Sequence, residues 1–83
     1  MQISFDWHDV RRCWLHESSK EAVAVYPITR ENSPHRYWLW VEEEENIKVV
    51  GVGRRCDSIW EVQKYLEPRQ IIFRDPQEKN YVN

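Results

Sequence analysis

One short segment constrains the fold of this chain more than any other. Residues 37–41 read Tyr-Trp-Leu-Trp-Val, so alternation along a strand puts Trp38 and Trp40 on one side and three other apolar residues on the opposite side. A strand that is apolar on both faces is hidden on both faces. We therefore predict that this segment is a central strand of a sheet.

The residues that follow predict a hairpin. Four glutamates at 42–45 lead into Asn46, and a second apolar run begins at Ile47. Asparagine tolerates the left-handed backbone that tight reversals need. We predict that 37–43 and 47–53 pair as an antiparallel hairpin with the glutamates as its solvated tip.

Two further strands and one helix are indicated. Residues 22–26 alternate until Pro27, which lacks an N–H and ends a strand or sits at an edge, and residues 70–74 form a short apolar run. Ser58 and Glu61 have the spacing of a capping box, so we predict a helix at 58–67.

The first stretch of the chain fits two structures. Ile3 and Phe5 alternate with polar residues as in a strand, whereas the apolar residues from Trp7 to Leu15 recur at helical spacing. We favour a helix over 7–17. The prediction is then an α+β two-layer domain: an antiparallel sheet of three to four strands, the helix at 58–67, and this N-terminal helix.

Composition bounds the class of protein. With 83 residues the chain has room for one domain, which we place at 1–76 with a polar tail at 77–83. A hydrophobic content of 41% and an aromatic content of 13% argue against disorder. No apolar stretch is long enough for a membrane span, and the N-terminus is unlike a secretory signal. We expect a cytoplasmic protein with reduced thiols at Cys13 and Cys56.

Two cysteines and two histidines could in principle act as metal ligands. A cysteine with a histidine could also act as a nucleophile with its general base. Their spacing matches no familiar zinc motif, and nothing indicates the orienting group and oxyanion hole that catalysis needs. We therefore expect no cofactor, no metal, no catalytic residue and no enzymatic activity from these four, which are His8, Cys13, His16 and Cys56.

The segment from Gly51 to Arg55 precedes the predicted helix. Free N–H groups at a helix start together with Arg54 and Arg55 can hold an anion. The segment lacks the third glycine of a dinucleotide fingerprint and the Gly-Lys-Ser/Thr of a P-loop. We favour a tight strand-to-helix turn with exposed arginines.

Nucleic acid is the weaker of two candidate partners. Bases can stack on Trp38 and Trp40 with arginines nearby, which would make the chain a single-stranded nucleic-acid-binding protein. However, 12 basic residues stand against 14 acidic ones, and no segment is strongly basic.

Another protein is the favoured partner. On a helix Trp60 stands about 100° from Ile59, off the apolar stripe, and tryptophan with arginine is the composition of interface hot spots. We predict a small non-enzymatic protein-binding module that occludes its partner, in the style of bacterial, plasmid and phage inhibitors or accessory factors. A homodimer through an edge strand, 70–74 or 22–26, is a special case, and no membrane is involved. The predicted contact residues are Trp38, Trp40, Arg54, Arg55, Trp60 and Lys64.

Overall fold

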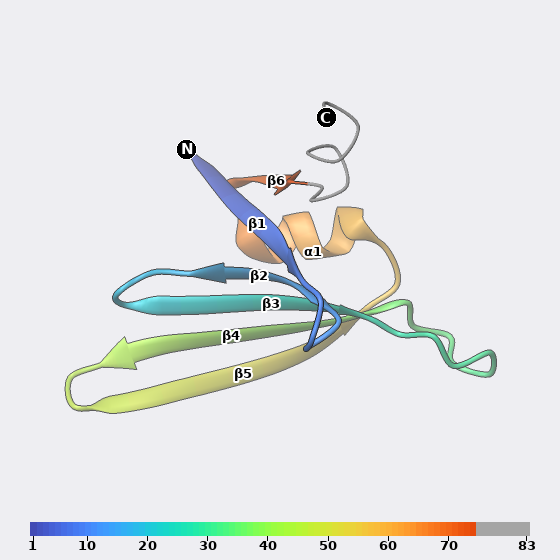
Figure 1. Ribbon diagram of the computed structural model, residues 1–83, viewed down its shortest axis with the longest axis horizontal. Helices are drawn as coiled ribbons and strands as arrows, with labels where there is room; N and C mark the ends of the chain where they lie inside the picture. The colour runs from blue at the N-terminus through green and yellow to red at the C-terminus, as the bar shows by residue number, and fades with distance from the viewer. Residues whose placement is uncertain (75–83) are drawn as a thin grey trace.

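The computed structural model describes residues 1–74, so the predicted tail at 77–83 lies outside the described residues. These residues form one sheet and one helix (Figure 1). The elements in chain order are β1 (Gln2–His8), β2 (Cys13–Glu17), β3 (Glu21–Pro27), β4 (Tyr37–Glu45), β5 (Lys48–Cys56), α1 (Ile59–Leu66) and β6 (Gln70–Arg74).

The sheet has six strands in the order β5-β4-β3-β2-β1-β6. Neighbours are antiparallel except β6, which runs parallel to β1. The prediction of an antiparallel sheet with three to four strands is therefore wrong, although a sheet with one helix is present. The parallel pair arises because α1 carries the chain from the β5 edge across the sheet to its other edge.

The predicted helix at 7–17 is also wrong, because this stretch forms the β1–β2 hairpin. Trp7 lies opposite Trp14, with ring centroids 5.3 Å apart and the rings edge to face. The turn between them is closed by the Arg12 N–H, which donates to the His8 carbonyl at 2.8 Å. A separation of seven residues spans two helical turns, but it also places residues opposite each other across a hairpin turn.

The predicted hairpin at 37–43 and 47–53 is confirmed by the pairing of β4 with β5. Asn46 takes the left-handed backbone at φ 58° in the turn. The strand containing 37–41 has neighbours on both sides, as predicted. Strand 22–26 is not an edge, because β3 lies between β2 and β4; the two edges are β5 and β6.

The predicted helix is present as α1. The Ser58 hydroxyl caps it by accepting from the Glu61 N–H at 3.3 Å, while the Glu61 carboxylate accepts from the N–H of Asp57 rather than from that of Ser58. Gln63 fastens the helix to β6: its amide donates to the Arg69 carbonyl at 2.6 Å and accepts from the Ile71 N–H at 2.9 Å.

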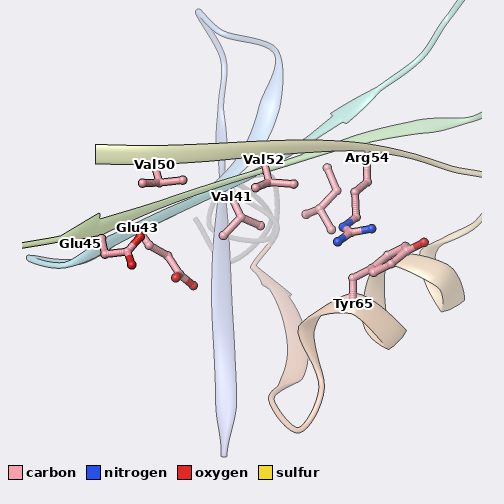
Figure 2. A pocket seen from close by; sticks show the side chains of 8 residues that line it. Val41, Glu43, Glu45, Val50, Val52, Arg54 and Tyr65 are labelled. Atoms are coloured by element: carbon pink, nitrogen blue, oxygen red, sulfur yellow. The ribbon is translucent and has the colours of Figure 1, made fainter. Parts of the chain in front are cut away.

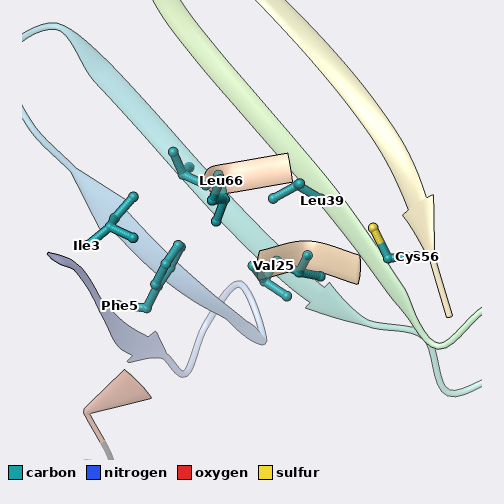
Figure 3. Packing of buried hydrophobic residues seen from close by; sticks show 8 residues of the cluster. Ile3, Phe5, Val25, Leu39, Cys56 and Leu66 are labelled. Carbon is teal, nitrogen blue, oxygen red and sulfur yellow. The ribbon is translucent and has the colours of Figure 1, made fainter. Parts of the chain in front are cut away.

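The hydrophobic core lies between α1 and one face of the sheet (Figure 3). Val62 and Leu66 of the helix pack onto buried side chains of the strands, among them Phe5 and Leu39, which are both 0% exposed. Among the described residues, no helix has the length and apolar character needed to cross a membrane. The buried core residues are Ile3, Phe5, Val23, Val25, Leu39, Cys56, Val62 and Leu66.

The helix covers only part of this face. A helix of eight residues is about 12 Å long, and the β4–β5 hairpin extends well beyond it (Figure 1). Val50 and Val52 on the far part of the hairpin are 42% and 47% exposed. The end of the sheet that carries this hairpin therefore has no second layer in residues 1–74.

Candidate functional site

The six predicted contact residues divide between the two faces of the sheet. Arg54 and Arg55 are neighbours on β5, so their side chains point to opposite faces. Arg54 lies on the helix face with Trp60 and Lys64. The opposite face, which we call the outer face, carries Arg55 beside the two tryptophans of β4. The prediction that these residues share one surface is not met.

On the outer face the two β4 tryptophans lie against the backbone of β5. A Cβ atom on Gly53 would stand 2.1 Å from Cζ2 of Trp38, and one on Gly51 would stand 2.3 Å from Cζ2 of Trp40. Both glycines are needed here because the indoles occupy the space of a side chain. No other strand or helix of residues 1–74 packs on this face, and both indoles are half-buried there.

The strand register extends this patch across the sheet. Ala24 lies between Leu15 and Trp40 and is only 3% exposed, so the centre of the patch is closed. The next row places Tyr26 beside Trp38. We call this surface the outer-face patch; its members are Leu15, Ala24, Tyr26, Trp38, Trp40 and Arg55.

The two ends of the outer-face patch differ in charge. At one end, Trp38 and Arg55 border an open hollow of about 660 Å³ that the β3–β4 loop completes with Arg30 and His35. At the other end, the Glu42 carboxylate accepts a hydrogen bond from Trp40 Nε1 at 2.7 Å. The patch thus runs from a basic end to an acidic end.

On the helix face a shallow apolar trough lies between the hairpin and α1 (Figure 2). It has a volume of about 240 Å³, and Val41, Val50 and Val52 form its floor. The Arg54 guanidinium lies 4.5 Å from the centre of the Tyr65 ring, and the Lys64 ammonium lies 4.8 Å from that of Trp60. Both cations are therefore held on aromatic rings.

Both cysteines are buried, and His16 lies against the backbone of β1. Cys13 and Cys56 are buried free thiols, and burial raises the pKa of both, so neither is a thiolate at neutral pH. His16 Nδ1 lies 3.0 Å from the Ser4 carbonyl oxygen. Within residues 1–74, no three side chains of His, Cys, Asp or Glu are grouped as metal ligands.

The predicted turn at 51–55 is wrong, because these residues continue β5 as an extended strand. Arg54 and Arg55 face opposite ways there and do not converge on one anion. The residues that sequence reasoning missed are Leu15, Tyr26 and the loop residues Arg30 and His35. The strand register places Leu15 and Tyr26 beside Trp40 and Trp38, and the β3–β4 loop brings Arg30 and His35 to the hollow beside Trp38. No protein family, curated protein or solved structure was found to match this chain.

The contact of Trp38 with Gly53 can be tested by substitution. Because the new methyl group would overlap the indole, we expect Gly53→Ala to lower the free energy of unfolding by about 1–3 kcal/mol in urea denaturation. In a Trp38→Ala background the same change should be stabilising by about 0.5–1 kcal/mol, since alanine is then the better strand residue. An equal loss in both backgrounds would show that the indole does not lie on this glycine.

Proposed function

We propose that the chain is a small protein-binding module whose contact surface is the outer-face patch. The observation that carries this proposal is that Trp38 and Trp40 lie across Gly53 and Gly51 on a sheet face that α1 does not cover. Rigid, half-buried aromatic rings with an arginine beside them are typical anchors of protein interfaces, because they bury much area at little entropic cost.

The charges of the patch indicate the chemistry of the partner. Arg30 and Arg55 border the hollow beside Trp38, whereas His35 there is paired with the Asp57 carboxylate at 2.7 Å, so the two arginines suit this end to an acidic side chain next to an apolar one. Glu42 and Glu44 lie at the other end of the same face, where a basic side chain fits. The partner surface that fits therefore has an apolar centre, an acidic side chain at one end and a basic side chain at the other. Binding would cover this surface of the partner and block its other contacts.

Single-stranded nucleic acid is the second candidate, since flat indoles beside Arg55 can stack bases. The acidic side chains on this face argue against nucleic acid. The Glu42 carboxylate accepts a hydrogen bond from Trp40 Nε1, and Glu42 and Glu44 would repel a phosphate backbone along this face. Titration with oligonucleotides at low salt should leave the tryptophan fluorescence unchanged. Strong quenching that salt reverses would favour nucleic acid over protein.

Affinity capture from native lysate with matched variants tests the protein-binding proposal. We expect the Trp38→Ala/Arg55→Ala variant to lose the partner that the wild-type chain retains. The Trp60→Ala/Lys64→Ala variant also removes one tryptophan and one cation, but on the helix face, and it should capture the partner at undiminished yield. Circular dichroism spectra of both variants should match that of the wild-type chain, which checks that both are folded.

Single arginine variants sharpen the same experiment. Arg55→Ala should weaken capture, whereas Arg54→Ala should not, because Arg54 is stacked on Tyr65 on the other face. Retention of the partner by the Trp38→Ala/Arg55→Ala variant, with loss by the helix-face variant, would refute the assignment to the outer face.

A further inference from the structure

The β5 strand is an edge that nothing in residues 1–74 protects. It is nine residues long and contains no proline, and no charged residue stands between Lys48 and Arg54. Val49, next to the turn, is 70% exposed. Natural sheets protect such edges with proline, charge or a covering loop, because an open edge recruits another strand. The other edge, β6, is only five residues long.

The backbone groups that point outward from this edge can be identified. The Glu44 N–H donates to the Lys20 carbonyl at 3.0 Å, on the side away from β5, so Glu44 and Val49 are not a hydrogen-bonded pair. In an antiparallel ladder such pairs alternate, so Val49, Gly51, Gly53 and Arg55 point their N–H and C=O groups to the open edge. Two of these four are glycines, which add no side chain of their own at the edge, although the indoles of Trp40 and Trp38 lie over them on the outer face.

We propose that the strand added to this edge is β5 of a second copy of this chain, running antiparallel about a two-fold axis. Charge complementarity selects this occupant. The hairpin tip holds Glu42–Glu45 with one lysine, Lys48, and the far end of β5 holds Arg54 and Arg55. Antiparallel pairing brings the arginine end of each copy to the acidic tip of the other, whereas parallel pairing sets like charges side by side.

The charges also bear on the register. Centring the axis on Gly51 would place Lys48 opposite Arg54 of the second copy, which is repulsive. Centring it on Val50 places Lys48 opposite Val52 and pairs Val49 with Gly51 through the outward backbone groups. Faces are preserved by this axis, so Arg54 lies opposite Asn46 of the second copy and reaches the acidic tip of that copy on the helix face, which carries Glu45.

Such a dimer covers the exposed valines of β5 and joins the sheets of the two copies into one. Val50 of each copy lies against Val50 of the other, next to Val52, so the apolar floor of the trough continues across the interface. The two outer-face patches come to lie on one continuous sheet. This inference concerns a different surface from the proposed function and does not depend on it.

The experiment is the molar mass of the full chain by light scattering and sedimentation, from low concentration up to about 1 mM. We expect a dimer of the wild-type chain. Val50→Lys sets two ammonium groups across the axis and should raise the dimer Kd about 100-fold or more. Val10→Lys, at an 89% exposed valine in the β1–β2 turn, is the matched control and should leave the Kd unchanged.

A charge exchange tests the register. Arg54→Glu and Glu45→Arg should each raise the dimer Kd about tenfold, and the two together should restore it, because the pair is re-formed with reversed signs. A chain that is monomeric at all concentrations, or a dimer that Val50→Lys leaves intact, would overturn the proposal. If the β5 edge binds only a strand of another protein, the wild-type chain stays monomeric, and that result would also overturn the proposal.

Discussion

Replacing Phe5 by alanine is expected to remove a large fraction of the stability of the protein. Phe5 is 0% exposed and packs on Phe73, with ring centroids 5.5 Å apart, at the junction of β1 with β6. Truncation of a buried phenylalanine costs about 3–5 kcal/mol. A chain of this length has a total stability of about 4–12 kcal/mol, so the loss is a large fraction of it. Urea denaturation followed by tryptophan fluorescence measures the loss.

Val10→Ala is the control for this prediction. Val10 is 89% exposed in the β1–β2 turn, so its truncation should change the free energy of unfolding by less than about 0.5 kcal/mol. A loss below about 1 kcal/mol for Phe5→Ala would mean that Phe5 is not at the centre of the core.

The parts of the fold that the sequence predicts are those set by local chemistry. Asn46 and the glutamates specify the β4–β5 turn, and Ser58 with Glu61 specifies the start of α1. These signals act within a few residues of each other, so they can be identified without knowing the rest of the chain.

The parts that escape prediction depend on distant contacts. The parallel pairing of β1 with β6 joins Ile3 to Ile71, and no local pattern encodes it. The spacing of Trp7 and Trp14 fits a helix as well as a hairpin, and only the pairing of β2 with β3 decides between them. Sheet order is therefore the level at which a single sequence stops being informative.

The arrangement of the candidate site was not predicted from the sequence for a related reason. Gly51 and Gly53 suggested a turn, but they are glycines because tryptophans of β4 cover them. Once 48–56 is known to be a strand, alternation alone separates Arg54 from Arg55 and assigns Trp38, Trp40 and Arg55 to one face. The residues were informative, but their secondary structure was misassigned.

The stability of the protein is expected to fall steeply above about pH 8.5, where an ordinary thiol begins to ionise. Burial raises the pKa of Cys13 and of Cys56, and both side chains are 0% exposed. Above this pH the unfolded chain loses thiol protons that the folded chain retains. The unfolded state is then favoured by up to about 1.4 kcal/mol per pH unit for each thiol, until the folded thiols ionise as well.

Urea denaturation between pH 7 and pH 10 measures this dependence, with Cys13→Ala/Cys56→Ala as the control. The variant is less stable at pH 7 because two side chains are shortened, but its stability should decline much less over the alkaline range. Tyr26, whose pKa is raised chiefly by burial and further by the nearby Cys13, adds a smaller decline near pH 10, of which the variant keeps only the part that burial causes. Equal alkaline slopes for the two proteins would show that the thiols ionise as readily in the fold as outside it.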